Sequence, residues 1–135
     1  MSAERQPIVL PPGGGRVYDM PRIRATFKAD GAETAGMYSI STWRLEPHCT
    51  GPGPHQHPED DVFFVTEGVM SLLVDGAWID APAGTFVLVP GGATHDFENR
   101  GDEPATVLNI SAPGAFEPHM PGIAAWFKEH PPSYA

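Results

Sequence analysis

The chain has 135 residues, of which 41% are hydrophobic, 15 are glycine and 16 are proline. This length suits one domain, and the hydrophobic share is enough to build a core, which excludes a disordered chain. Seventeen acidic and eight basic side chains give a net charge of −9, which opposes binding to nucleic acid or to an anionic membrane.

The sequence also carries signals about its compartment. No apolar run approaches the roughly 18 residues of a membrane span, and residues 1–10 lack the charged-then-apolar order of a signal peptide. The single cysteine, Cys49, cannot form an intrachain disulfide, which agrees with a reducing compartment. We therefore expect a cytoplasmic protein.

The predicted elements are mostly short strands. Residues 1–15 end in a Pro-Pro-Gly-Gly-Gly run, which cannot hold a helix and predicts an arm or an edge loop. Strand-like segments then recur about every ten residues. They cover residues 23–29, 37–45, 61–65, 69–74, 77–81, 85–89, 95–99 and 105–110. The Asp75-Gly76 pair and residues 100–103 have the composition of hairpin turns.

Only the C-terminal part has helical spacing. Ile123, Trp126 and Phe127 fall at i, i+3 and i+4 between proline-containing segments, so we expect a helix against the outside of the sheets. Because no helices separate the strands, the pattern indicates an antiparallel sandwich or barrel, and we predict the jelly-roll type.

A group of histidines is the candidate functional site of this sequence. His55 and His57 are two residues apart, so in an extended chain both imidazoles point to one side and can share a metal ion. A bend at Pro58 would return the carboxylate of Asp61 toward them, and His95 follows a tight turn and could supply a fourth ligand. A solvated pair without a metal is the alternative interpretation.

These residues stand in patterns that resemble the cupin superfamily. The second cupin motif, G-x5-P-x-G-x2-H-x3-N, is matched by Gly84, Pro90, Gly92, His95 and Asn99. The first motif is matched by His55, His57 and Gly68, with Asp61 where the family has Glu and Cys49 where it has Gly. The resemblance covers residues 35–117. The run HQHPEDDVFFVTEG and residues 113–117 are similar to small quercetinase-like cupins.

The resemblance implies an all-β fold, a cupin jelly-roll β-barrel (a double-stranded β-helix) with a short C-terminal helix. Residues 1–135 would form one domain, with an arm at 1–15, the barrel motifs at 35–117 and a helix and tail at 118–135. It also implies one divalent metal ion, of Fe, Mn, Ni, Co or Zn. The implied ligands are His55, His57, Asp61 and His95.

The aspartate is a departure from the family pattern. Asp61 is one methylene shorter than Glu, which withdraws its carboxylate by about 1.5 Å unless the backbone follows. The carboxylate could therefore bind the metal directly, bind through water, or leave a site of three histidines. Glu59 or Asp60 could take its place less easily.

Strand alternation predicts a pocket beside the metal. If Asp61 points inward, Phe63 and Val65 do so too, and His95 likewise carries Phe97. We also expect Tyr38, Trp43 and Met70 at the barrel mouth. For each of these residues, plain barrel core is the alternative. Residues expected to have no part in the site are Cys49, a packing residue, Glu67, a structural residue, and the surface histidines His48, His119 and His130.

The function implied by the resemblance is that of a metal-dependent dioxygenase acting on a small aromatic or enolic molecule, with Asp61 tuning the metal or acting as base. A non-redox isomerase, cyclase or lyase is the first alternative, and a non-enzymatic small-molecule-binding barrel is the second. We also expect a homodimer, because small jelly rolls leave strand edges and apolar faces uncovered and the arm at 1–15 could pair with a neighbour.

Overall fold

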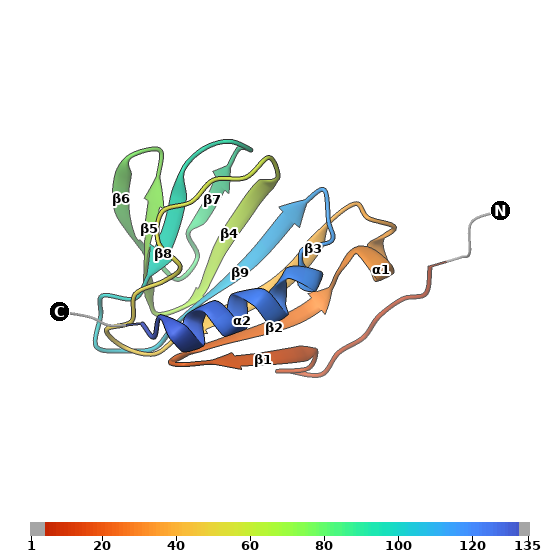
Figure 1. The fold of residues 1–135 in the computed structure, drawn as a ribbon, viewed down its shortest axis with the longest axis horizontal. Coiled ribbons are helices and arrows are strands. Elements are labelled where there is room, and N and C mark those ends of the chain that lie inside the picture. Colours follow the sequence, from red (N-terminus) through yellow and green to blue (C-terminus); the bar gives the residue numbers. More distant parts are fainter. Residues whose placement is uncertain (1–4, 133–135) are drawn as a thin grey trace.

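Two antiparallel sheets make up most of the computed structural model, which describes residues 5–132 (Figure 1). The larger sheet has the strand order β1-β2-β3-β9-β4-β7, and the smaller has the order β6-β5-β8. The strands are β1 (Arg16–Met20), β2 (Ile23–Ala29), β3 (Ser39–Leu45), β4 (Asp60–Glu67), β5 (Val69–Val74), β6 (Ala77–Pro82), β7 (Phe86–Val89), β8 (His95–Glu98) and β9 (Ala105–Ala112). The expected jelly-roll β-barrel is confirmed.

All eight predicted strands are present, and one strand was not predicted. β1 has no clear alternation of polar and apolar residues in the sequence, and it forms because it pairs along its whole length with β2. A single helical turn, α1 (Gly31–Thr34), was also missed, since four residues are too few to show helical periodicity.

The inner face of the larger sheet changes character along its strands. Val65 of β4 lies opposite Val107 of β9, and both are fully buried, as is usual for a barrel core. Two residues along, Phe63 lies opposite Asn109, and Asp61 lies opposite Ser111. One end of the barrel is therefore apolar and closed, whereas the other carries polar side chains.

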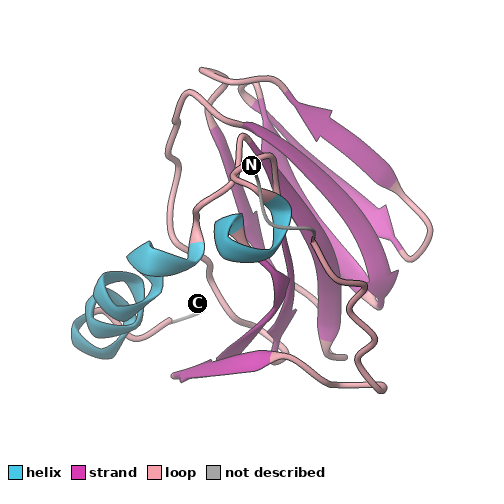
Figure 2. Ribbon diagram, turned by 90° about the vertical axis from the view of Figure 1, so that its right-hand side faces the viewer, coloured by secondary structure: helices cyan, strands magenta, loops and turns pink. Residues whose placement is uncertain are grey.

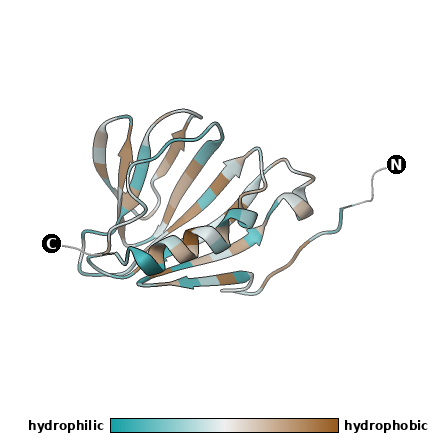
Figure 3. Cartoon of the chain, in the orientation of Figure 1, coloured by the Kyte–Doolittle hydropathy of each residue, from teal (hydrophilic) through white to brown (hydrophobic). Residues whose placement is uncertain are grey.

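The core runs between the two sheets, and Figure 3 shows hydrophobic residues along the strands of both. Its largest buried side chains come from both sheets and from the C-terminal segment, and they include Phe27, Leu45, Met70, Leu72 and Phe127. Sheets and helix therefore share one core.

The C-terminal segment forms the turn η1 (Glu117–His119) and the helix α2 (Met120–Glu129). The expectation that this helix lies against the outside of the sheets is wrong. It packs beside β1, on one side of the strands (Figure 2), and it buries Met120 and Phe127 in the core because its apolar stripe closes the side that the small sheet leaves open. Within residues 5–132, no helix is both long enough and apolar enough to span a membrane.

Candidate metal centre

Three histidines, two from a loop and one from the start of a strand, meet at the polar end of the barrel. His55 and His57 lie in the loop between β3 and β4, and His95 is the first residue of β8. The backbones of His55 and His95 bond in both directions, N to O, at 3.0 and 2.9 Å. Because this bridge keeps the chain extended at His55, the side chains of His55 and His57 reach the same side, as their spacing predicts.

Neighbouring groups hold the loop in place. The carboxylate of Asp96 accepts hydrogen bonds from the backbone amides of Gly53, at 3.1 Å, and Phe97, at 2.8 Å. A side chain at Gly51 would overlap the carbonyl oxygen of Phe97, and one at Gly91 would overlap that of Pro58. The loop between β3 and β4 therefore packs backbone to backbone against β8 and the turn before it, which only glycine permits at these positions.

Each imidazole is oriented by a backbone carbonyl two residues away in the sequence. The Nδ1 atoms lie 2.7 Å from the oxygen of Gly53 for His55, 3.2 Å from that of Glu59 for His57, and 2.9 Å from that of Ala93 for His95. A carbonyl oxygen only accepts, so each Nδ1 carries the proton, and each neutral ring presents the lone pair of Nε2 to the site. Metal-binding histidines are commonly held in this way.

The carboxylate of Asp61 faces two of these rings. Its Oδ2 atom is 2.9 Å from Nε2 of His57 and 3.1 Å from Nε2 of His95. Its Oδ1 atom accepts hydrogen bonds from Oγ of Ser111 at 2.6 Å and from Nδ2 of Asn109 at 3.0 Å. Of the two carboxylate oxygens, one is thus held by β9 and the other is directed at the histidines.

These contacts match the donor set of a cation site. His95 Nε2 is buried and makes no hydrogen bond, although it lies within ion-pair distance of Asp61. When the proton of His95 is on Nδ1, the lone pair of its Nε2 atom faces the carboxylate oxygen of Asp61 with no proton between the two atoms. This contact is unfavourable unless Nε2 is also protonated or a cation binds both Nε2 and the carboxylate.

The donor atoms of all three histidines lie within 4.8 Å of one another. The residues present therefore fit a divalent metal ion. Neither alternative carboxylate has this position. Asp60 accepts a hydrogen bond from the backbone amide of Gly91, and Glu59 lies beside the Nδ1 side of His57, 3.3 Å away.

Burial and charge act on the site in opposite directions. Burial lowers the pKa of His55, which keeps this imidazole neutral, as metal ligation requires. Burial also disfavours the charged forms of Asp61 and His95. The contact with His95 and the hydrogen bonds from Ser111 and Asn109 nevertheless lower the pKa of Asp61, and the contacts with Asp61 and the carbonyl of Ala93 raise that of His95. Asp61 is thus stabilised as a carboxylate despite being only 4% exposed.

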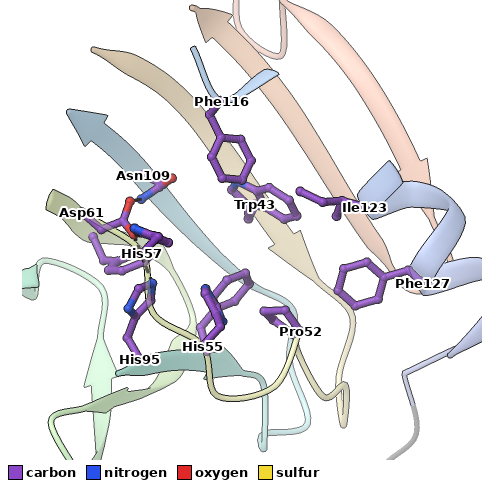
Figure 4. Close-up of a pocket in the computed structure, with 12 residues that line it drawn as sticks. Trp43, Pro52, His55, His57, Asp61, His95, Asn109, Phe116, Ile123 and Phe127 are labelled. Atoms are coloured by element: carbon purple, nitrogen blue, oxygen red, sulfur yellow. Dashed lines mark hydrogen bonds and ion pairs between the residues drawn. The ribbon is translucent and has the colours of Figure 1, made fainter. Parts of the chain in front are cut away.

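A cavity of about 270 Å³ opens from the histidines toward the C-terminal helix (Figure 4). Its polar end is formed by the three histidines, Asp61 and Asn109. The rest of its lining is apolar and mainly aromatic, and consists of Trp43, Pro52, Phe63, Phe97, Phe116, Ile123 and Phe127. Among the described residues that line it, none is a lysine or an arginine.

The six expected pocket residues divide into two groups. Phe63, Phe97 and Trp43 line the cavity. Val65 and Met70 do not, because they lie in the closed apolar core and are fully buried there. Tyr38 does not either, because it precedes β3 and lines a separate surface hollow.

Several lining residues were missed from the sequence. Asn109 had a detectable signal, since it is a polar residue in step with the buried positions of an apolar strand. Phe116, Ile123 and Phe127 come from the C-terminal segment, whose position over the barrel depends on tertiary contacts. Cys49 is a fully buried packing residue, as expected, and burial raises the pKa of its thiol to about 11.

The histidines and the acidic residue expected to lie outside the site do so. His48 is exposed and contacts Asp102, and His119 and His130 are exposed on the C-terminal segment. Glu67 accepts a hydrogen bond from Thr106 and pairs with Arg44 on the outside of the sheet, which is the structural role expected for it.

Solved structures with the same fold include proteins with several activities. A predicted oxalate decarboxylase from Thermotoga maritima is 15% identical, with a TM-score of 0.71, over 78% of this chain and 98% of that one. A sugar phosphate isomerase from Silicibacter pomeroyi is 21% identical, with a TM-score of 0.63, over 78% and 75%. The polyketide cyclase RemF from Streptomyces resistomycificus is 19% identical, with a TM-score of 0.61, over 73% and 71%.

At these identities the likeness shows the fold alone. A search of curated protein sequences gave no match. The sequence profile of the cupin domain matches residues 41–111, which include all three histidines and Asp61. This chain therefore belongs to the cupin family.

Proposed function

We propose that this cupin is a metal-dependent dioxygenase for a small aromatic or enolic molecule. The observation that carries the proposal is the position of three convergent Nε2 lone pairs at the end of an aromatic-lined cavity of about 270 Å³. This volume suits a molecule of one or two rings, and the apolar lining would favour a flat, uncharged body. The bound ion would be one of Fe, Mn, Ni, Co or Zn.

In this proposal His55, His57, His95 and Asp61 hold the ion, which supplies Lewis-acid or redox chemistry when bound. The carboxylate of Asp61 lies where it can also accept a proton from an enol or phenol hydroxyl. Phe63, Phe97 and Trp43 exclude water from the substrate. Asn109 uses Nδ2 for Asp61 and for the carbonyl of Val62, which leaves its Oδ1 to accept a hydrogen bond from the substrate.

A non-redox cyclase, isomerase or lyase is the second candidate. It is supported by the carboxylate beside the histidines, which could move a proton while the ion polarises a carbonyl. Within this class the cavity favours cyclisation of an aromatic or enolic chain over sugar phosphate isomerisation, because no described lining residue is a lysine or an arginine that would bind a phosphate.

We place the protein in the cytoplasm, since its only thiol is buried and unpaired.

The first experiment is elemental analysis of untagged protein purified without chelator. It compares the unaltered protein with the His57→Ala, His95→Ala double variant, and uses His119→Ala as a control for loss of an exposed histidine. We expect close to one Fe, Mn, Ni, Co or Zn per chain in the unaltered protein and in the control, and none in the double variant. Equal trace metal in all three proteins, also after reconstitution, would contradict a metal site.

The loaded protein is then screened with phenolic and enolic compounds in an oxygen electrode and, separately, under nitrogen. The dioxygenase proposal requires O2 uptake that matches substrate loss and stops in the double variant. Turnover at the same rate under nitrogen would instead support the cyclase, isomerase or lyase. Tight binding of a compound without turnover under either atmosphere would support a binding barrel.

A further inference from the structure

A second hollow lies beside the cavity at the histidines. It has a volume of about 200 Å³, and it shares three lining residues with the cavity: His57, Phe116 and Ile123. Its other lining residues are Glu59, Ser111, Pro113, Gly114, Ala115 and His119. The two spaces therefore adjoin at the three shared side chains, of which Phe116 and Ile123 come from the C-terminal segment (Figure 4).

The second hollow reaches the proposed metal site from its own side. Along β9, Asn109 lines the cavity, and Ser111, two residues further on, lines the hollow. Ser111 donates a hydrogen bond to the carboxylate of Asp61 at 2.6 Å, so the inner end of the hollow touches the same centre as the cavity. Toward solvent it is bordered by Glu59, whose side chain is 40% exposed. The hollow is therefore the space into which a ligand longer than the cavity would extend.

Phe116, between the two spaces, is fixed by both its backbone and its ring. Its backbone amide donates a hydrogen bond to Oδ1 of Asp30 at 3.0 Å. Its ring stacks on that of Phe27, with 5.9 Å between the ring centroids and 17° between the ring planes. Two residues earlier, a Cβ added to Gly114 would lie 2.5 Å from the backbone of Tyr38, so the chain is in close contact there as well. The ring of Phe116 is therefore a fixed wall.

We propose that Phe116 determines the size of the ligand that this site accepts, because its ring closes the cavity to flat molecules of more than about two rings. The inference rests on the proposed function, in which the substrate is a small aromatic or enolic molecule. Replacing the ring with a methyl group would join the cavity and the hollow into one space, more than half as large again as the cavity alone. A longer ligand would then keep its polar end at the histidines and place its far end in the hollow.

The lining of the hollow also restricts the charge of such a ligand. Among the described residues that line it, none is a lysine or an arginine, and Glu59 is acidic. The chain as a whole has a net charge of −9, which repels anions. A ligand that extends into the hollow is therefore neutral, and the test uses neutral compounds.

The test compares three flat compounds that carry the same pair of adjacent hydroxyl groups and differ in length: catechol and the corresponding diols of naphthalene and anthracene. Equilibrium dialysis of the metal-loaded protein under nitrogen measures binding separately from turnover. In the unaltered protein we expect the anthracene diol to bind at least about tenfold more weakly than the naphthalene diol. In Phe116→Ala its affinity should rise by about tenfold or more, whereas that of catechol should change by less than about threefold, because one ring does not reach the wall.

Two further variants separate the position of the wall from a general loss of packing. Phe116→Leu keeps an apolar contact with Phe27 and should give a smaller gain in the same direction. Phe127→Leu is the matched control, since Phe127 lines the cavity but not the hollow, and it should leave the order of the three affinities unchanged. Metal content and circular dichroism show whether each variant keeps the site and the fold.

An anthracene diol that binds the unaltered protein as tightly as the naphthalene diol would overturn the proposal, and so would an unchanged order of affinities in both Phe116 variants. Binding of none of the three diols to any of the proteins would overturn it too, and the metal content would then show whether the metal site fails with it. Selection by length that depends on Phe116, but without O2 uptake, would contradict the dioxygenase and still support the role of Phe116.

Discussion

Asp61 is the residue at which this site departs from the family pattern. Its shorter side chain is compensated by its position, because it lies in β4 opposite Ser111, and its Oδ2 atom is within 3.1 Å of two imidazole nitrogens. The Oδ1 atom is held by Ser111 and Asn109, so the carboxylate is oriented before a metal binds. Preorganisation of this kind raises metal affinity without adding a ligand.

We predict that Ser111→Ala weakens metal binding about tenfold, the lower end of the usual effect of removing a group that orients a ligand. Asp61→Asn should weaken it further, because it removes the charge itself. Isothermal titration with Mn²⁺, Co²⁺ or Ni²⁺ measures both effects. Ser71→Ala is the matched control, since Ser71 is also a buried serine that donates to a carboxylate, that of Asp80, in the other sheet.

An unchanged affinity in Ser111→Ala would mean that Asn109 alone orients Asp61. An unchanged affinity in Asp61→Asn would mean that the ion is held by the three histidines, which is one of the arrangements that the Asp for Glu exchange leaves open.

At the scale of elements, the turn between β4 and β5 depends on Gly68. This residue has a φ of +68°, and an added Cβ would overlap the carbonyl oxygen of Pro104 in the approach to β9. Gly76, in the turn between β5 and β6, has a φ of +86° with open space around it. Both turns need a left-handed residue, but only the first also packs against another element.

We therefore predict that Gly76→Ala lowers the free energy of unfolding by about 1 kcal/mol, the cost of a left-handed alanine. Gly68→Ala should lower it by a further 1–3 kcal/mol or so, because the backbone must move to relieve the overlap. Urea denaturation of the two variants side by side isolates the packing contribution. Equal losses would show that β4 and β9 can separate at this point without cost.

The C-terminal segment is held over the cavity by Asp30, which is buried at the start of α1. Its Oδ1 atom accepts hydrogen bonds from the backbone amides of Phe116 and Glu117, both at 3.0 Å. Burial disfavours the charged form of Asp30, but these hydrogen bonds outweigh burial and lower its pKa. Phe116 lines the cavity and stacks on Phe27, so Asp30 connects the folding of α1 with the shape of the site.

This lowered pKa predicts how stability depends on pH. A carboxyl group whose pKa is lower in the folded state stabilises the fold above its unfolded pKa of about 4, and this contribution is lost as the pH falls through the folded value. Asp30→Asn should therefore cost about 1–2 kcal/mol at neutral pH and less at about pH 3. Urea denaturation at both pH values measures the difference.

The control for this prediction is Asp19→Asn, which removes the same charge from an exposed ion pair with Arg24. Pairs of this kind contribute little, so its effect should stay below about 0.5 kcal/mol at either pH. A loss in Asp30→Asn that did not shrink toward acid would mean that the carboxylate charge does not stabilise the segment.

For the whole molecule, the metal site joins parts of the chain that are far apart in sequence. Its proposed ligands come from the loop before β4, from β4 itself and from β8, and β4 and β8 lie in different sheets. A metal ion bound here therefore connects the two sheets in the folded state only. Binding to the folded state alone raises stability by mass action.

We expect a metal concentration of 100 times the dissociation constant to raise the free energy of unfolding by about 2.7 kcal/mol. Denaturation with and without the metal measures this increase, and the His57→Ala, His95→Ala variant should show none. An equal increase in that variant would place the stabilising ion elsewhere on this acidic chain.

The fold was largely predictable from the sequence because strands and turns are indicated by patterns of neighbouring residues. Glycine and proline at regular spacing and alternating side chains gave the positions of eight strands, and the conformational demands of turns are local properties. β1 and α1 could not be found in this way, since β1 forms by pairing with β2 and α1 is a single turn tied to Phe116 and Glu117 through Asp30.

The sequence by itself determined the cluster of donors. His55 and His57 share one side because an extended chain repeats every two residues, and the motif spacing singled out His95 and Asp61. Only the tertiary structure decided what surrounds them. The orientation of Asp61 depends on Ser111 and Asn109, about 50 residues away in the sequence.

The cavity depends in the same way on α2, which the periodicity of its sequence predicts as a helix but does not place. The orientation of Asp61 and the position of α2 follow from packing between distant segments, which no local pattern encodes.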